Sequence, residues 1–170
     1  MWTISKRFKV DYSHRVFNQD LKLMHLHEKC KNFHGHTSEI VLYITSSNLV
    51  NDMVLDYTFL KPVTFERYGY IHPRELDHKL LISRKDPLYK KIIDMYQVVD
   101  PKDDTYYVCD SLFIVDFVPT AENMARFFYY QLKGTLDKLL DNVMFKDLQI
   151  EKLAVEFNET EDSKCYYTED

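Results

Sequence analysis

The sequence predicts an α+β fold with antiparallel strands, for three reasons. Residues 6–14 alternate apolar with polar side chains, as a half-buried strand does, and residues 36–45 form a second run of strand-forming residues. The longest helical pattern comes much later, after Pro119. Two more strand-like runs, at 153–159 and 163–168, close the chain. Strands that flank the helices in this order, rather than alternating with them, favour antiparallel pairing.

The first two strands place histidines at their ends. In residues 6–14, His14 closes the strand on the same face as the apolar residues. The second strand begins near His36, and His34 lies two residues before it. If the chain is extended there, both imidazoles point to one side. Ser, Asn and Asp residues then mark a turn over 46–52.

Helical segments and a hairpin follow this turn. Asp56 is a candidate N-cap for a helix over 57–69, which ends near Gly69. A short helical piece is expected at 73–80. Residues 105–117, rich in Tyr, Val, Phe and Ile, predict a strand or a hairpin.

The clearest helix opens at Thr120, which can cap it. Apolar residues spaced by three and four define its buried stripe: Met124, Phe127, Phe128, Leu132, Leu136, Leu139 and Leu140. The pattern as a whole predicts one domain over residues 1–170, with an insertion at about 83–117. Within the insertion, residues 95–107 are expected to form an extra surface loop.

Composition describes an ordinary globular protein and excludes several classes. Apolar residues make up 45% of the 170 residues and charged residues 29%. The net charge of −5, without a basic patch, argues against a nucleic-acid partner. No apolar run approaches the roughly 18 residues of a membrane span, and the N-terminus lacks a signal peptide's apolar segment. Three widely spaced cysteines form no disulfide framework, so we expect a reducing, cytoplasmic location.

One thiol and three imidazoles, close together in the sequence, indicate a metal site. His14, His34 and His36 can supply three neutral nitrogens; with an open fourth position, this is the arrangement of a catalytic zinc (Zn2+) site. Cys30 leaves two alternatives open. As a fourth ligand it would close the site and make it structural. Left free, it would be a thiolate beside a cation, able to accept a proton.

Other readings of these histidines compete with that site. Histidines in surface loops are common, and His25 and His27, beside Glu28, form a second candidate ligand cluster. Gly35 is one of only three glycines in the chain and separates two of the imidazoles, which suggests a tight backbone requirement there.

Two carboxylates could add to the chemistry. Asp77 precedes His78, and a carboxylate beside an imidazole raises its basicity and fixes its tautomer, although adjacent Asp–His pairs are usually loop or helix-start residues. Glu159 continues the apolar face of a strand. In a pocket it could accept paired N–H bonds from the edge of a pterin or guanine ring; on an exposed strand end it would simply be solvated.

Six segments, taken in order, resemble the 6-pyruvoyl-tetrahydropterin synthase / 6-carboxy-tetrahydropterin synthase family. They cover nearly the whole chain, and none is decisive alone. The segments are Ser13-His14-Arg15, Cys30-x-x-x-His34-Gly35-His36, Met53-Val54-Leu55-Asp56-Tyr57 with Leu60-Lys61, Leu76-Asp77-His78, Pro119-Thr120-Ala121-Glu122-Asn123, and Glu159-Thr160 with Tyr166 or Tyr167 following.

The resemblance implies a fold, an assembly and a set of roles. The fold is the tunnelling fold (T-fold), a four-stranded antiparallel sheet with two helices packed on one face. Trimers form through the sheets and stack as a homohexamer, a dimer of trimers, with active sites at subunit interfaces. The residues carried over are the zinc ligands His14, His34 and His36, the catalytic group Cys30, Asp77 and His78, and the pterin contacts Glu159 and Thr120.

The family's substrate is 7,8-dihydroneopterin triphosphate, and its branches differ in product. The pyruvoyl branch eliminates triphosphate. The carboxy branch also cleaves the side chain, giving 6-carboxy-5,6,7,8-tetrahydropterin, acetaldehyde and triphosphate, and it serves 7-deazaguanine and queuosine synthesis. Three residues separate Cys30 from His34, as in the carboxy enzymes, whereas animal-type pyruvoyl enzymes have five. A folate-related third branch has glutamate where this chain has Phe33.

We therefore expect a zinc-dependent lyase of the carboxy type, acting on carbon–oxygen and carbon–carbon bonds. A pyruvoyl synthase on the same scaffold is the first alternative. The second is a non-catalytic pterin-binding module in which zinc is a structural tie.

Overall fold

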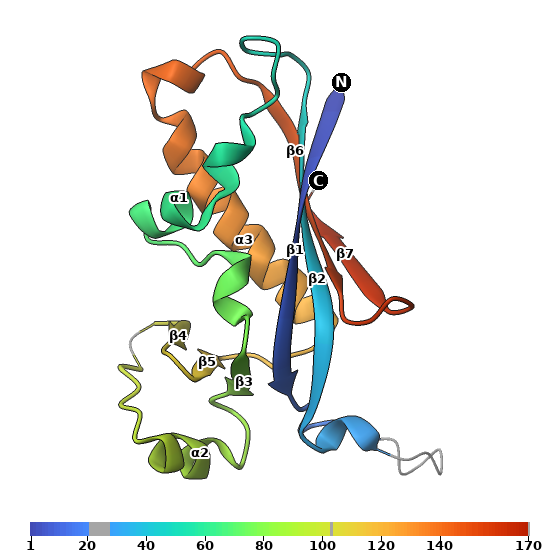
Figure 1. Cartoon of the computed structure of the whole chain (residues 1–170), viewed down its shortest axis with the longest axis vertical. Helices are drawn as coiled ribbons and strands as arrows, with labels where there is room; N and C mark the ends of the chain where they lie inside the picture. The colour runs from blue at the N-terminus through green and yellow to red at the C-terminus, as the bar shows by residue number, and fades with distance from the viewer. Residues whose placement is uncertain (21–27, 103, 170) are drawn as a thin grey trace.

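The fold is organised by one sheet that runs the length of the molecule (Figure 1). The computed structural model describes residues 1–20, 28–102 and 104–169. Over these residues the sheet has seven strands, in the order β4-β5-β3-β1-β2-β6-β7. The strands are β1 (Trp2–His14), β2 (His34–Ser46), β3 (Lys79–Ser83), β4 (Tyr106–Val108), β5 (Leu112–Val115), β6 (Ile150–Asn158) and β7 (Lys164–Thr168). The α-helices are α1 (Pro62–Arg67), α2 (Tyr89–Tyr96) and α3 (Ala121–Leu140).

Four of these strands form the antiparallel arrangement that the sequence predicts. β1 pairs with β2 along its whole length, from Trp2↔Ser46 to His14↔His34. β6 pairs with β2, and β7 returns against β6 as a hairpin. In β1 the even-numbered residues from Phe8 onward are buried and the odd-numbered ones are more exposed. The predicted strand faces are therefore confirmed.

The sheet as a whole is mixed, so the expected four-stranded antiparallel sheet is wrong as a complete description. β3 runs parallel to the end of β1, through Tyr12↔Lys79 and Ser13↔Leu80, and β5 runs parallel to β3. β4 pairs antiparallel with β5, which confirms the hairpin predicted at 105–117. β5 and the second half of β3 are fully buried. They carry continuous apolar runs rather than an alternating pattern, and periodicity does not reveal such strands.

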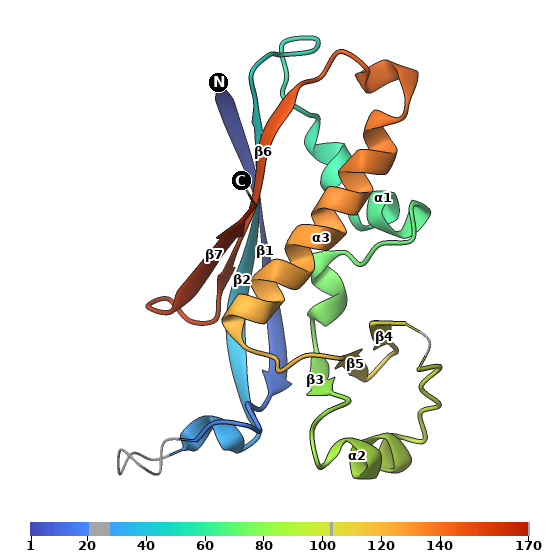
Figure 2. The same ribbon diagram turned by 180° about the vertical axis from the view of Figure 1, so that it is seen from behind.

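α1 and α3 lie on the same face of the sheet, as Figures 1 and 2 show from opposite sides. α3 packs against β6 and β7 through its apolar stripe. The hydroxyl oxygen of Thr120 accepts a hydrogen bond from the backbone N–H of Asn123 (3.4 Å), which confirms Thr120 as the cap of α3.

The helix predicted over 57–69 is divided in two. Asp56 does cap the first part, since its carboxylate accepts a backbone N–H (2.7 Å), but that part is a 3₁₀ turn, Tyr57–Leu60. The residue before Pro62 is extended, because proline disfavours helical backbone there, and α1 starts anew at the proline. Gly69 ends the segment as predicted, with φ +79° and its N–H bonded to a carbonyl in the last turn of α1.

The insertion contains more regular structure than the sequence indicates. The helical piece expected at 73–80 stops after a 3₁₀ turn, Pro73–Leu76; His78, with φ +59°, turns the chain into β3. α2 was not predicted. The segment 95–107, expected as a surface loop, holds a buried carboxylate at Asp100.

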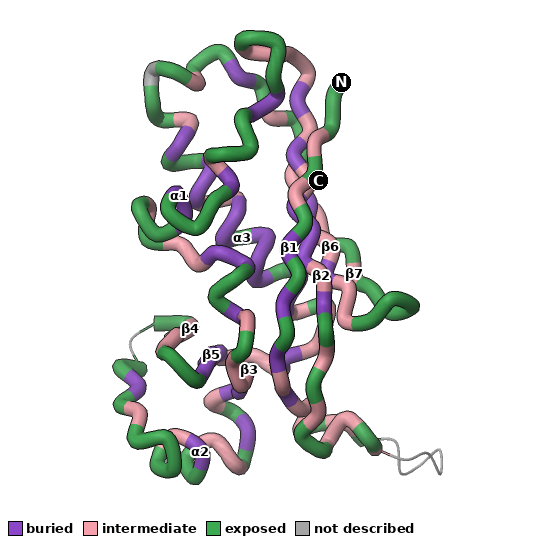
Figure 3. The backbone as a smooth tube through the Cα atoms, viewed as in Figure 1, coloured by how far each residue is buried: buried purple, intermediate pink, exposed green. Residues whose placement is uncertain are grey.

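Two apolar clusters stabilise the sheet. The larger lies between α3 and the even-numbered faces of β1 and β2. The smaller joins α2 to β3 and β5 through Ile82, Ile92, Leu112 and Ile114. Figure 3 shows the buried residues along β1, β2, β6 and α3, with exposed residues alternating along β1. No helix in the described part of the chain combines the length and hydrophobicity needed to traverse a bilayer.

One imidazole, His72, is sealed in the larger cluster. It is 2% exposed and stacks edge-on against Phe8 and Phe65. Its Nδ1 accepts the backbone N–H of Arg74 (3.1 Å), so Nε2 is the donor to the carbonyl of Leu60 (3.2 Å). Burial lowers the pKa of His72 to about 4, so the ring is neutral at pH 7.

We expect His72 to make the folding free energy depend on pH. The unfolded ring takes up a proton below its ordinary pKa of 6.5, whereas the folded ring does so only near 4. Its contribution to stability is therefore complete above pH 6.5 and is lost as the pH falls toward 4, by about 3 kcal/mol. Urea unfolding at pH 7.5 and 4.5 measures this loss. His72→Gln should lose about 3 kcal/mol less than the wild type between these pH values; an equal loss in both proteins would contradict the assignment.

Candidate metal centre

His14, His34 and His36 come together at one end of the β1–β2 pair. The pairing sets His14 directly opposite His34, and His36 lies two residues along β2 on the same face. One potential ligand atom from each residue lies within 4.8 Å of the other two. The ring centroids are 4.7–5.2 Å apart. Over the described residues, this is the group of His, Cys, Asp and Glu side chains that could hold a metal ion.

Backbone carbonyls orient two of the three rings. His14 Nδ1 lies 2.8 Å from the carbonyl oxygen of Pro119, and His34 Nδ1 lies 2.8 Å from that of Asn32. A carbonyl can only accept a hydrogen bond, so each Nδ1 carries the proton and each Nε2 keeps its lone pair. Metal-binding histidines are commonly held in this way, by a hydrogen bond from the second ring nitrogen.

Burial keeps His14 and His36 in the neutral form that binds metals. His14 is 1% exposed, and burial lowers its pKa to about 4, although the hydrogen bond to Pro119 raises it. The pKa of His36 is also lowered, mainly by burial, against the raising effect of Glu159. Both rings therefore offer a lone pair at neutral pH.

The residues present fit a metal ion. The Nε2 atoms of His14 and His36 are buried and have no hydrogen-bond partner. A buried nitrogen without a partner is unfavourable, and a divalent metal bound between the three rings would satisfy both atoms. Gly35 supports this geometry, because a Cβ at that position would approach the carbonyl oxygen of Tyr12 to 3.2 Å. The tight backbone requirement predicted there is a close approach of β2 to β1.

Glu159 lies beside the histidines. Its Oε1 is 3.4 Å from His14 Nε2 and 3.7 Å from His36 Nε2, and its side chain is 26% exposed. The residue follows the last one in β6, and its backbone carbonyl accepts a hydrogen bond from the buried hydroxyl of Ser38 (3.1 Å). This anchors the carboxylate at the mouth of the cluster. It is not an exposed strand end, which was the alternative that the sequence left open.

Cys30 lies near this cluster but outside the ligand group. It occupies a 3₁₀ turn, Lys29–Lys31, and its carbonyl accepts a hydrogen bond from the N–H of Val16 (2.7 Å), two residues beyond His14. It is half-buried and free, as are the other two cysteines of the chain, Cys109 and Cys165. The alternative ligands His25 and His27 lie outside the described residues.

Asp77 and His78 form a pair of their own. Asp77 Oδ2 is 3.1 Å from His78 Nδ1, and Asp77 Oδ1 accepts the backbone N–H of Asp11 (2.8 Å). Burial raises the pKa of Asp77, but the hydrogen bonds to Asp11 and His78 lower it by more. The net pKa therefore lies below the ordinary value. The carboxylate is therefore charged and can stabilise a proton on the imidazole.

This pair faces away from the histidine cluster. His78 lines a cavity of about 610 Å³ together with Asp11, Ser13 and Thr37, whose side chains leave β1 and β2 on the face opposite to His14. Tyr12 and His36 also border the cavity, but their rings pack toward each other and toward His14. Within one chain, the sheet separates the Asp77–His78 pair from the metal centre.

Sequence reasoning missed the carbonyl groups that orient the rings. The segment at Pro119 was singled out for Thr120, whose hydroxyl caps α3; its role as a substrate contact stays a prediction. The carbonyl of Pro119 serves the site instead. Side-chain patterns carry no signal for a backbone acceptor 105 positions away from its donor.

A known protein family matches the chain over nearly its whole length. A family model described as 6-pyruvoyl tetrahydropterin synthase matches residues 3–170. The chain belongs to this family. The resemblance read from the six segments is therefore confirmed.

Two named relatives align with this chain over nearly the full length of both proteins. The chain is 31% identical to a 6-carboxy-5,6,7,8-tetrahydropterin synthase of Aquifex aeolicus (strain VF5), covering 99% of both chains. It is 27% identical to a protein of the same name from Haemophilus influenzae (strain ATCC 51907 / DSM 11121 / KW20 / Rd), over 99% of this chain and all of the relative.

Solved structures show the same fold. An uncharacterized protein of Wolinella succinogenes has a TM-score of 0.72 at 22% identity, over 99% of this chain and 98% of the other. The 6-pyruvoyl tetrahydropterin synthase of Plasmodium vivax has a TM-score of 0.61 at 11% identity, over 100% and 99% of the two chains. The predicted α+β architecture of this family is thus confirmed.

We expect His36→Ala to weaken binding of a divalent metal by about 100-fold, because it removes one of three ligands from a site whose other ligands stay in place. Competition with a chromophoric chelator measures the dissociation constant. His72→Gln removes an imidazole from the same fold outside the cluster and should bind as the wild type does. Equal affinities for His36→Ala and the wild type would show that the metal binds elsewhere.

Proposed function

We propose that this protein is a zinc-dependent 6-carboxy-5,6,7,8-tetrahydropterin synthase. It would convert 7,8-dihydroneopterin triphosphate and one water molecule to 6-carboxytetrahydropterin, acetaldehyde and triphosphate, for 7-deazaguanine or queuosine synthesis. The observation that carries the proposal is the cluster of three histidines, in which the Nε2 atoms of His14 and His36 are buried and have no hydrogen-bond partner. The choice of the carboxy branch is supported by two relatives with that name and by the three-residue spacing from Cys30 to His34.

The histidine cluster fits zinc, which when bound would supply a Lewis acid for the oxygens of the substrate side chain. The other roles belong to the chain itself. Cys30, free and next to the cluster, would accept or return a proton. His78 would move a second proton at its Nε2, while Asp77 holds Nδ1. Glu159, at the mouth of the cluster, would accept N–H bonds from the pterin edge, with Thr120 as a second contact.

These roles require a second copy of the chain. The sheet separates the histidine cluster from the Asp77–His78 pair, so a substrate that touches both sets would lie between subunits. Two open sheet edges are available for such an assembly. Over the described residues, β1 has no partner strand on its outer side before Tyr12, and β7 is an edge strand. This supports a homohexamer of two trimers with interfacial active sites.

Subunit mixing tests the interfacial site. We expect Cys30→Ala and His78→Ala to be inactive separately and to recover activity when they are co-refolded. A site is intact where the thiol comes from one variant and the imidazole from the other, so equal mixing should restore about one quarter of wild-type activity. A mixture as inactive as its two parents would show that both residues of each site come from one chain.

Product analysis tests the reaction itself. Zinc-loaded protein is incubated with 7,8-dihydroneopterin triphosphate, and the pterin and the small carbon fragment are identified by mass spectrometry. Release of acetaldehyde with 6-carboxytetrahydropterin supports the proposal. A pyruvoyl product without acetaldehyde would assign the chain to the other branch, which the family model's own description favours.

The turnover rate and the zinc content of Cys30→Ala distinguish an enzyme from a binding module. If the thiol moves a proton, the substitution should lower kcat by at least about 100-fold while the zinc content stays at the wild-type level. Zinc content is measured by atomic emission on the purified variant. Full turnover in Cys30→Ala would point to a pterin-binding module, and a loss of zinc would identify Cys30 as a fourth ligand.

A further inference from the structure

The insertion holds a buried carboxylate that the proposed reaction does not use. Asp86 is 4% exposed. Its Oδ1 accepts the backbone N–H of Leu88 (2.8 Å), and its Oδ2 lies 3.0 Å from Arg15 Nε. Within the described part of the chain, Arg15 is the cation within ion-pair distance of this carboxylate. A buried charge is strongly unfavourable without a partner, so Asp86 and Arg15 are held to each other.

Arg15 lies between the insertion and the metal centre. It follows His14 directly in the chain, and its side chain is 17% exposed. On its other side the guanidinium lies over the ring of Phe33, 5.5 Å from the centroid, and Phe33 directly precedes His34. One side chain therefore contacts the insertion and the residue next to a ligand, while its backbone is continuous with another ligand.

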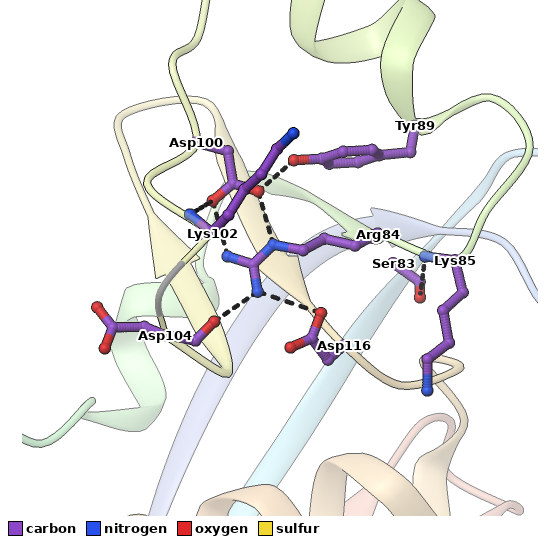
Figure 4. Close-up of polar contacts among 8 residues, drawn as sticks. All are labelled: Ser83, Arg84, Lys85, Tyr89, Asp100, Lys102, Asp104 and Asp116. Atoms are coloured by element: carbon purple, nitrogen blue, oxygen red, sulfur yellow. Dashed lines mark hydrogen bonds and ion pairs between the residues drawn. The ribbon is translucent and has the colours of Figure 1, made fainter.

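Close to Asp86, Arg84 is the centre of a network of polar contacts within the insertion (Figure 4). Two residues before Asp86, the guanidinium of Arg84 donates two hydrogen bonds to the carboxylate of Asp100 (2.6 and 2.7 Å). It also donates to the carbonyl of Asp104 (2.6 Å) and lies 3.2 Å from the carboxylate of Asp116. Arg84 lies at the start of the insertion, and its planar guanidinium contacts groups from the middle and the far end, which fixes the relative positions of these segments.

The chain that directly follows the insertion also contacts His14. Three residues after Asp116, the carbonyl of Pro119 accepts the hydrogen bond from His14 Nδ1. His14 is thus held by Pro119 through its ring and by the Arg15–Asp86 pair through its backbone. Asp86 lies near the start of the insertion, and Pro119 lies just after its end. The ion pair between Arg84 and Asp116 connects these two places.

We propose that Arg15 is a positioning residue: its ion pair with Asp86 fixes the end of β1 against the insertion and so holds the imidazole of His14 in its metal-binding orientation. The inference rests on the proposed function, because it takes zinc to be the metal that the histidine cluster binds. It assigns the insertion a role at the site, although none of the described residues between 84 and 116 supplies a ligand atom to the cluster.

Zinc affinity tests the role of the pair. Arg15→Met and Asp86→Asn should each weaken zinc binding by about 10-fold, the range seen when a group that orients a ligand is removed. The double variant should bind no more weakly than either single one, because the two residues act as a unit. Arg15→Lys, which keeps the charge but not the Nε–H group beside Asp86, should recover part of the affinity.

The matched control is Arg7→Met. Arg7 lies on β1, the strand that ends directly before Arg15, and it also pairs with a carboxylate, Glu39 at 3.2 Å, but this pair is on the exposed face. This variant should bind zinc as the wild type does. The absorption bands of bound Co2+ give a second readout. They should shift in Arg15→Met and Asp86→Asn if the His14 ring moves, and remain unchanged in Arg7→Met.

Urea unfolding of the metal-free variants separates positioning from stability. Lower stability in Arg15→Met and Asp86→Asn with wild-type zinc affinity and Co2+ spectra would overturn this proposal alone and leave the pair a structural tie. Wild-type protein that binds no zinc would overturn the proposed function and this inference together.

Discussion

The antiparallel pairing of β1 with β2 is the constraint on which the rest of the site depends. It runs over all thirteen residues of each strand and sets His14 opposite His34. Because side chains alternate between faces, a shift of one residue would send His14 and His34 to opposite sides of the sheet. The buried apolar residues in the middle of the same strands resist such a shift, since it would expose Phe8, Ile40 and Leu42. The core therefore determines the geometry of the metal centre.

The same alternation explains why one chain carries two separate chemical groups. Even-numbered residues of β1 and β2 point under α3 and hold the neutral imidazoles; odd-numbered residues point to the uncovered face, where His78 lies. Burial suits a metal centre, because it keeps imidazoles unprotonated. Exposure suits a group that exchanges protons. A reaction that uses both needs the faces of different subunits to meet, which links the proposed chemistry to the proposed assembly.

In the insertion, buried ion pairs hold the chain in place where little apolar surface is buried. Its own apolar cluster is limited to a few side chains around Ile92 and Ile114. Arg84 and Asp100, both largely buried, join the start of the insertion to its middle, and hydrogen bonding to Arg84 lowers the pKa of Asp100 to about 2. Such a pair fixes geometry because breaking it leaves an unpaired buried charge. Rigidity of this kind is what a segment would need if it positions His14 without binding the metal.

The sequence by itself determined the elements whose physics is local. Alternation predicted the faces of β1 and β6, Thr120 and Asp56 were identified as caps, and the three histidines followed from their spacing on extended chain. Tertiary structure alone decided the rest. β3 is buried by packing, so it shows no periodicity, and its parallel pairing with β1 and β5 joins segments far apart in the sequence. The carbonyl of Pro119 reaches His14 across 105 positions, and Arg15 reaches Asp86 across the insertion. Local patterns record which face of an element is buried, but a partner distant in sequence is chosen only when the chain folds.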